Sequence, residues 1–179
     1  KPAQRMKIPR QEMPCQPPTV RVKNFREVAL GFTPAQARLE AARCIQCARP
    51  ACVQGCPVGI DIPGFLRELV LDRRGEAARV IQRSSSLGSV CGRVCPQERQ
   101  CEAQCVLGIR QQPLSIGRLE RFACDGPREI RPVAAAAPPT GRKIAVVGAG
   151  PAGLTVAGDL LRLGHRVTEI APTRSAAVK

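Results

Sequence analysis

The sequence of 179 residues is poor in aromatic side chains: it has no Trp, no Tyr and only four Phe. Aromatic residues normally supply much of the buried area of a domain, so we expect a cofactor to fill interior space that side chains do not. The net charge of +14 favours an acidic partner or a phosphate-bearing cofactor, or else reflects arginines on solvated helix faces. The scarcity of aromatic side chains for base stacking argues against nucleic-acid binding.

Membrane-spanning and export segments are also missing from the sequence. A transmembrane helix needs about 18 apolar residues in succession, whereas the longest run of small apolar residues, 133–137, ends at Pro138-Pro139. No cationic-then-apolar leader with a small-residue cleavage site is present. We therefore expect a cytoplasmic protein. Because the chain lacks an initiator Met, we interpret it as a fragment of a longer polypeptide.

Cysteine, in contrast, is abundant and regularly spaced. Eight of the ten cysteines fall within 62 residues, in the runs C-x2-C-x4-C-x3-C-P and C-x3-C-P followed by two more. These eight are Cys44, Cys47, Cys52, Cys56, Cys91, Cys95, Cys101 and Cys105. Bacterial iron–sulfur proteins use the run C-x2-C-x2-C-x3-C-P, whose last cysteine binds the other cluster of a pair. The sequence therefore predicts an electron carrier, and its two Cys-Pro endings suggest two clusters.

A disulfide scaffold and a zinc site are two other structures that use many cysteines. A disulfide scaffold belongs to an oxidising compartment, for which the sequence offers no export signal. A zinc protein usually has two separate C-x2-C pairs or histidine ligands. Here only one C-x2-C occurs, and the single histidine, His165, lies far downstream. Iron–sulfur binding in a reducing compartment is the better interpretation.

The pattern around the first cysteines is helical. Residues 1–24 contain five prolines and predict an extended lead, in which Cys15 is a free surface thiol. Residues 33–36, Thr-Pro-Ala-Gln, have the form of a capping box and predict a helix through Arg43 that delivers Cys44.

Further helices are predicted from the spacing of apolar residues. One begins near Pro63 with Phe65, Leu66, Leu69 and Val70 on its inner face, another begins at Glu76, and a third covers residues 116–124 after Ser115. We expect a loop over residues 88–96. A short helix over residues 97–106 would place Cys101 and Cys105 on one face.

The pattern changes after residues 131–142, which predict a linker. Residues 143–147 have the pattern of a buried strand, 151–163 of a helix and 166–170 of a second strand. The motif G-x-G-x-x-G stands between the first strand and the helix and comprises Gly148, Ala149, Gly150, Pro151, Ala152 and Gly153. In this context it predicts a dinucleotide site at the helix N-terminus. Glu169 is the only acid near the position where a ribose-binding carboxylate is expected.

These segments together resemble one family. Residues 44–63, 90–98, 100–102 and 116–122 are similar to the N-terminal iron–sulfur domain of the NADPH-dependent glutamate synthase small subunit, the NADH-dependent ferredoxin:NADP oxidoreductase large subunit and dihydropyrimidine dehydrogenase. Residues 22–31 resemble the family's lead into its first helix, and residues 57–63 lean slightly toward the ferredoxin:NADP oxidoreductase branch. The resemblance spans about residues 20–168.

The resemblance implies a mainly α fold. A helical two-cluster domain is followed by the first β-α-β unit of a Rossmann-like α/β FAD domain. The implied division is an extended lead over 1–24, the [4Fe-4S] domain over 25–130, a linker over 131–142 and the start of the FAD/NAD(P)-binding domain over 143–179.

The resemblance also implies ligands. One [4Fe-4S] cluster would be held by Cys44, Cys47, Cys52 and Cys105, and the other by Cys56, Cys95, Cys101 and Glu120. Glu120 lies beside an apolar helix face, where a bare carboxylate is costly, although it could instead face solvent and pair with Arg118 or Arg121. Cys91 and Cys124 are not ligands in this pattern, and we expect both to be small buried apolar residues. FAD would bind the glycine motif, but the family's acid stands near Ala171, where this chain has none.

The implied function is electron transfer in an NAD(P)H-dependent iron–sulfur flavoprotein oxidoreductase. FAD would exchange electrons with NADP(H) bound to a missing C-terminal part, and the clusters would connect FAD to a partner subunit, such as a glutamate synthase large subunit, a ferredoxin or a flavoprotein subunit. No residue is predicted to be a catalytic acid, base or nucleophile. Two alternatives are a basic zinc-stapled nucleic-acid-binding module and a truncated, non-catalytic scaffold that keeps clusters without flavin.

Overall fold

The computed structural model describes residues 2–126 and 137–171. They belong to two compact units, one within residues 1–129 and the other within residues 130–179. Residues 131–136 of the predicted linker and the last residues, 172–179, lie outside the described part. Among the described residues, no helix combines the length and the apolar character needed to cross a membrane.

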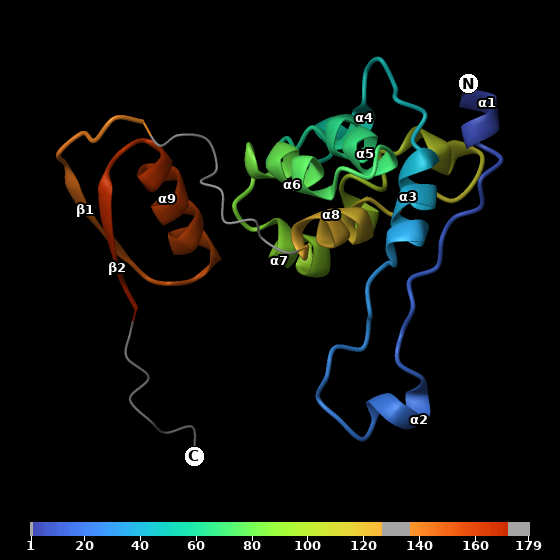
Figure 1. Ribbon diagram of the computed structural model, residues 1–179, viewed down its shortest axis with the longest axis horizontal. Coiled ribbons are helices and arrows are strands. Elements are labelled where there is room, and N and C mark those ends of the chain that lie inside the picture. Colours follow the sequence, from blue (N-terminus) through green and yellow to red (C-terminus); the bar gives the residue numbers. More distant parts are fainter. Residues whose placement is uncertain (1, 127–136, 172–179) are drawn as a thin grey trace. The chain divides into compact units, whose positions relative to one another are not determined.

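The first unit is built from short helices (Figure 1). Helix α7 packs on α8, while α5 packs on both α6 and α3. The elements are α1 Pro2–Arg5, α2 Pro18–Arg21, α3 Pro34–Ala42, α4 Ala51–Gln54, α5 Ile62–Val70, α6 Arg74–Gln82, α7 Gly88–Val94, the 3-10 helices η1 Gln97–Arg99 and η2 Val106–Ile109, and α8 Ile116–Cys124.

Local sequence signals explain where the helices begin. The predicted capping box before α3 is confirmed: the Gln36 backbone N–H donates to Thr33 Oγ1 at 3.3 Å, and the Thr33 N–H donates to Gln36 Oε1 at 3.1 Å. Helix α5 begins after Asp61, whose carboxylate accepts the Gly64 N–H at 2.9 Å. The predicted inner face of α5 is buried apart from Val70, which is 36% exposed.

The predicted loop over residues 88–96 is wrong, because residues 88–94 form helix α7. Gly88 and Gly92 lower the helix propensity of this segment, but close packing on α8 requires them. A Cβ atom on Gly92 would lie 2.6 Å from the Arg121 backbone nitrogen. Tertiary packing therefore stabilises a helix that local propensity disfavours.

The short helix predicted over residues 97–106 is also wrong. This segment forms η1, then turns, and only then enters η2. A turn marked by the bond from Cys105 N to Glu102 O lies between the two cysteines. Cys101 and Cys105 consequently do not share a helical face. Helix α6 begins at Arg74, two residues earlier than the predicted Glu76.

The N-terminal lead has more structure than its prolines predict. It contains α1 and α2, and Cys15 forms an isolated antiparallel bridge with Ala29. Backbone hydrogen bonds from Gln16 N to Val28 O and from Leu30 N to Pro14 O, both 2.8 Å, hold this bridge. This one bridge supplies two backbone hydrogen bonds to the lead, whose prolines have no N–H group to donate.

The core of the first unit is mainly aliphatic. Its largest fully buried apolar residues are Ile62, Phe65, Leu66, Ile81, Leu114, Ile116 and Leu119. Cys101 belongs to this core, and Cys44, Cys52, Cys56 and Cys105 pack against it. The cysteine segments are therefore positioned by the same side chains that stabilise the fold.

The second unit is a β-α-β unit. Strand β1 (Lys143–Val147) and strand β2 (Arg166–Ile170) are parallel, with Lys143 opposite Arg166 and Val147 opposite Ile170. Helix α9 (Pro151–Arg162) connects them. The two strands and the helix lie where the sequence pattern predicts them.

Candidate metal centre

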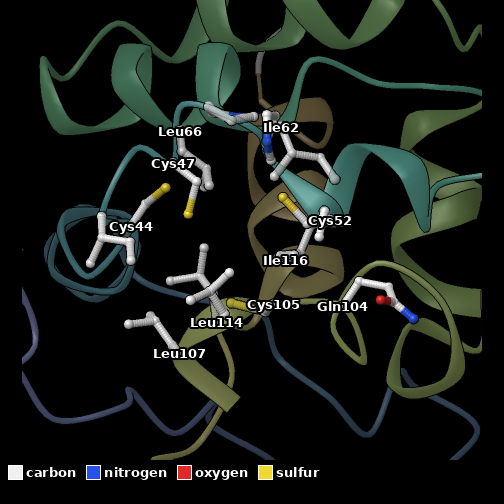
Figure 2. Close-up of a pocket in the computed structure, with 15 residues that line it drawn as sticks. Cys44, Cys47, Cys52, Ile62, Leu66, Gln104, Cys105, Leu107, Leu114 and Ile116 are labelled. Carbon is white, nitrogen blue, oxygen red and sulfur yellow. The ribbon is translucent and has the colours of Figure 1, made fainter. Parts of the chain in front are cut away.

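Four of the predicted ligands line one pocket of the first unit. Figure 2 shows the side chains of Cys44, Cys47, Cys52 and Cys105 directed toward a common space. Apolar side chains form its walls, namely Ile45, Ile62, Leu66, Val106, Leu107, Leu114 and Ile116. Soft sulfur donors in an apolar wall are the chemistry that iron–sulfur clusters and other thiophilic metals prefer.

Three segments supply these sulfurs, and the third lies far from the other two in the sequence. Cys44 and Cys47 follow α3, Cys52 lies on α4, and Cys105 precedes η2. The approach of the third segment depends on Gly55, where a Cβ atom would lie 2.8 Å from both the Gln100 carbonyl oxygen and Gln104 Cγ. A side chain at this position would separate α4 from the loop that carries Cys105.

Burial weakens the acidity of two thiols of this pocket. It raises the pKa of Cys52 to about 12 and also raises the pKa of Cys44. The neighbouring thiol of Cys105 contributes to both shifts as a like charge. Thiolates can persist here only with a cationic group that compensates them, so metal binding would release protons from this pocket.

The other predicted ligands form a second neighbourhood. Burial raises the pKa of Cys95 to about 11 and the pKa of Cys101 to about 12. Cys56 and Glu120 each add to both shifts through their charges, so both groups lie within electrostatic reach of Cys95 and of Cys101.

Glu120 is the most unusual member of this neighbourhood. It is only 6% exposed, and its Oε1 atom has no hydrogen-bond partner among the described residues. Burial raises its pKa to about 7. The alternative that Glu120 faces solvent beside Arg118 or Arg121 is wrong, because Glu120 is buried; Arg121 pairs instead with Glu27 and Asp125. A buried carboxylate without a donor costs free energy unless a cation or proton satisfies it.

The remaining cysteines differ from one another. Cys15 is exposed, as predicted, whereas Cys91 and Cys124 are half-buried rather than fully buried. Cys91 lies beside Cys95, whose pKa it raises. All ten cysteines are within the described residues and are free of disulfides. Within the same residues, no three His, Cys, Asp or Glu side chains are grouped around a position for a single metal ion.

A buried ion pair behind the pocket was missed by the sequence interpretation. Arg43 Nη1 lies 2.7 Å from Glu40 Oε1, and both side chains are almost inaccessible to solvent. Glu40 accepts the backbone N–H groups of Gln11 and Ser115 at 2.7 and 2.9 Å. Arg43 donates to the carbonyl oxygens of Ile8, Gln112 and Pro113.

This ion pair ties the lead, α3 and the segment before α8 together, immediately before Cys44. The i,i+3 spacing of opposite charges is visible in the sequence. Spacing alone does not distinguish a buried pair from a surface pair, so its importance could not be predicted.

The glycine motif of the second unit has the backbone of a phosphate-binding turn. Gly148 has a φ of 110°, which favours glycine, and a Cβ atom on Gly153 would overlap the Gly148 carbonyl oxygen. Gly150 has no neighbouring atom within 4 Å of such a Cβ position, so a ligand could approach the N-terminus of α9 there. Glu169 Oε1 lies 3.5 Å from the Cβ position of Gly153, so this carboxylate points back to the turn.

Comparison with known proteins gives a consistent match. The profile of the family described as dihydropyrimidine dehydrogenase domain II, 4Fe-4S cluster, matches residues 21–131. The chain is 39% identical over 159 residues to the glutamate synthase [NADPH] small chain of Escherichia coli, covering 88% of this chain and 34% of that protein.

Two further relatives show the same pattern. The putative oxidoreductase UacF of Escherichia coli is 41% identical over 150 residues, which are 82% of this chain and 24% of the relative. The NAD-dependent dihydropyrimidine dehydrogenase subunit PreT of Salmonella typhimurium is 38% identical over 143 residues, which are 79% and 35% of the two chains. The chain thus spans about a third or less of the length of these relatives.

Proposed function

The chain belongs to the 4Fe-4S family of dihydropyrimidine dehydrogenase domain II, and we propose that it is the electron-transfer module of an NAD(P)H-dependent iron–sulfur flavoprotein oxidoreductase. The observation that carries this proposal is the convergence of four cysteine side chains on one apolar pocket. A [4Fe-4S] cluster, when bound, accepts and releases single electrons at a potential that its surroundings set.

One proposed cluster is held by Cys44, Cys47, Cys52 and Cys105. The apolar wall of their pocket keeps water away from the sulfurs, and low solvent exposure is one of the factors that set cluster potentials. The weak acidity of Cys52 means that this site holds protons when it holds no metal. Loading is therefore expected to be more favourable at higher pH.

The other proposed cluster is held by Cys56, Cys95, Cys101 and the carboxylate of Glu120. The fit of this set rests on the orphaned Glu120 Oε1 atom, because a metal ligand role would satisfy an oxygen that has no other partner among the described residues. A carboxylate ligand in place of a thiolate would give the two clusters different potentials.

The second unit is proposed to be the start of a Rossmann-like FAD domain. Its parallel β1-α9-β2 arrangement with the glycine turn supports this assignment. Val147, Ile170, Leu154 and Val156 are exposed apolar residues that neighbouring strands and helices of a larger sheet would cover. We further propose that NADP(H) binds elsewhere in the full-length protein and that the clusters connect FAD to a partner oxidoreductase subunit, in the cytoplasm.

The ligand assignment can be tested by single substitutions in anaerobically purified protein. Cys52→Ser and Cys101→Ser are each expected to remove the iron and acid-labile sulfide of one cluster, as measured by chemical analysis. Cys15→Ser is the matched control, because Cys15 is exposed and belongs to neither set. Cys91→Ser is expected to keep both clusters although Cys91 lies beside Cys95. Full iron content in Cys52→Ser would contradict the assignment.

A further inference from the structure

Gln46 has an unusual backbone conformation between the first two cysteines. Its φ of 54° lies in the left-handed region, which among the non-glycine residues of the described part is shared only by Asp72. Residues with a Cβ atom rarely adopt this conformation. Strain of this kind persists where the surrounding structure enforces it, and it occurs often at functional sites.

The side chain of Gln46 is held at both ends of its amide. Its Nε2 atom donates to the sulfur of Cys44 at 3.4 Å and to the Pro63 carbonyl oxygen at 3.0 Å. Its Oε1 atom accepts from Arg67 Nη2 at 3.2 Å. Because the carbonyl group can only accept and the guanidinium can only donate, these partners determine which end of the amide faces the sulfur.

We propose that Gln46 is a positioning residue that raises the reduction potential of the cluster bound through Cys44, by donating an N–H···S hydrogen bond to that ligand sulfur. This inference rests on the proposed ligand role of Cys44. Reduction adds negative charge that is shared with the ligand sulfurs, and a hydrogen bond to a sulfur stabilises the more negative state more strongly. Hydrogen bonds to the sulfurs are a recognised means by which a protein sets cluster potentials.

The structure also indicates how the donor is kept in place. Pro63 and Arg67 lie on α5, which is part of the hydrophobic core through Phe65 and Leu66. The Gln46 amide therefore bridges the core helix and the metal-binding loop. A merely structural bridge would affect cluster retention alone, whereas a donor to sulfur also affects the potential.

The test is a redox titration of the anaerobically purified chain, monitored by electron paramagnetic resonance. Gln46→Met replaces the amide side chain with an unbranched side chain of similar length that has no N–H donor. Gln46→Glu replaces the N–H donor with a carboxylate acceptor. Both are expected to lower one midpoint potential and leave the other unchanged, Gln46→Glu by more. We expect reduction to become three- to tenfold less favourable in Gln46→Met, a tenfold change being 59 mV for a one-electron couple.

Matched controls are available in the same region. Gln54 is an exposed glutamine on α4, between Cys52 and Cys56. Gln54→Met and Gln54→Glu make the same chemical changes at an exposed position, so they measure the effect of composition and charge alone. Arg67→Met leaves Gln46 intact but removes the bond that holds its Oε1 atom. It is expected to produce a smaller shift in the same direction.

The outcomes distinguish this inference from the proposed function. Unchanged midpoints in a Gln46→Met protein with full iron content would overturn the inference and leave the cluster assignment intact. A wild-type chain that binds no iron would instead overturn the proposed function. If Gln46→Met loses one cluster, Arg67→Met decides: an unchanged midpoint, or loss of the same cluster, would mean that Gln46 has only a structural role.

Discussion

Replacement of Arg43 by Met is expected to destabilise the first unit severely. Arg43 is 1% and Glu40 0% exposed, with 2.7 Å between their charged atoms. The substitution leaves the Glu40 carboxylate buried with two backbone N–H donors and no cation. It also removes the donor from three carbonyl groups, those of Ile8, Gln112 and Pro113.

The size of the expected loss in the free energy of unfolding follows from the burial of this ion pair. Removing one partner of a buried ion pair costs about 3–5 kcal/mol, because the other charge stays buried without compensation. With a urea dependence of about 2 kcal/mol per molar for a unit of this size, the unfolding midpoint should fall by roughly 2 M. Far-UV circular dichroism is the suitable probe, since the chain has no Trp or Tyr for fluorescence.

The chain supplies a matched control for this experiment. Arg79 and Glu76 form an ion pair with the same i,i+3 spacing and a distance of 2.9 Å, but both side chains are 47% exposed. Arg79→Met should change the free energy of unfolding by less than about 1 kcal/mol. Equal effects of Arg43→Met and Arg79→Met would refute the reasoning that burial, rather than pairing, determines the cost.

Three further predictions concern stability. Gly92→Ala should destabilise the α7–α8 contact, since its Cβ would lie 2.6 Å from the Arg121 nitrogen, whereas Gly75→Ala, with only Arg79 at 4.0 Å, should be neutral or slightly stabilising. Thr33→Ala should cost about 1 kcal/mol in urea unfolding by removing the cap of α3. In cluster-stripped protein, Glu120 should make stability fall by about 3 kcal/mol as pH rises from about 4.5 through about 7.

Proton binding to Glu120 explains why stability should fall as pH rises. Burial raises the pKa of Glu120 from 4.5 to about 7 in the folded state, so the folded protein binds the proton more tightly than the unfolded chain. This stabilisation is complete below pH 4.5 and is lost as pH rises through about 7. Glu120→Gln should abolish this pH dependence, and an unchanged pH dependence in that variant would contradict the burial of an unpaired carboxylate.

Local sequence signals were sufficient to predict much of the fold. The capping box before α3 and the apolar spacing of α5 and α8 predicted these helices, because their sequences agree with the fold at the level of single turns. The strand–glycine turn–helix–strand pattern was likewise predicted. Each of these signals depends on residues within about four positions of one another.

The wrong predictions of secondary structure fall in segments whose conformation depends on contacts with residues distant in the sequence. Helix α7 depends on the close approach of Gly92 to α8, which no local pattern reveals. The segment between Cys101 and Cys105 turns between η1 and η2, although the i,i+4 spacing of the two cysteines fits one helical face. The spacing of cysteines indicated soft-metal binding, but spacing cannot show which sulfurs meet. Their division into two ligand sets came from the family resemblance and stays a prediction.

The two most informative polar contacts were also beyond the sequence. The Glu40–Arg43 pair and the amide of Gln46 owe their importance to burial and to partners such as Ser115, Pro63 and Arg67. A glutamine between two cysteines looks like any polar loop residue until its hydrogen-bond partners are known.

The most direct test of the cluster assignment is the iron and acid-labile sulfide content of the anaerobically purified wild-type chain, measured together with its visible absorption spectrum. Two bound [4Fe-4S] clusters would make the protein brown and give it equal amounts of iron and acid-labile sulfide. A colourless chain that folds with zinc or with no metal in the cysteine pocket would contradict the cluster assignment.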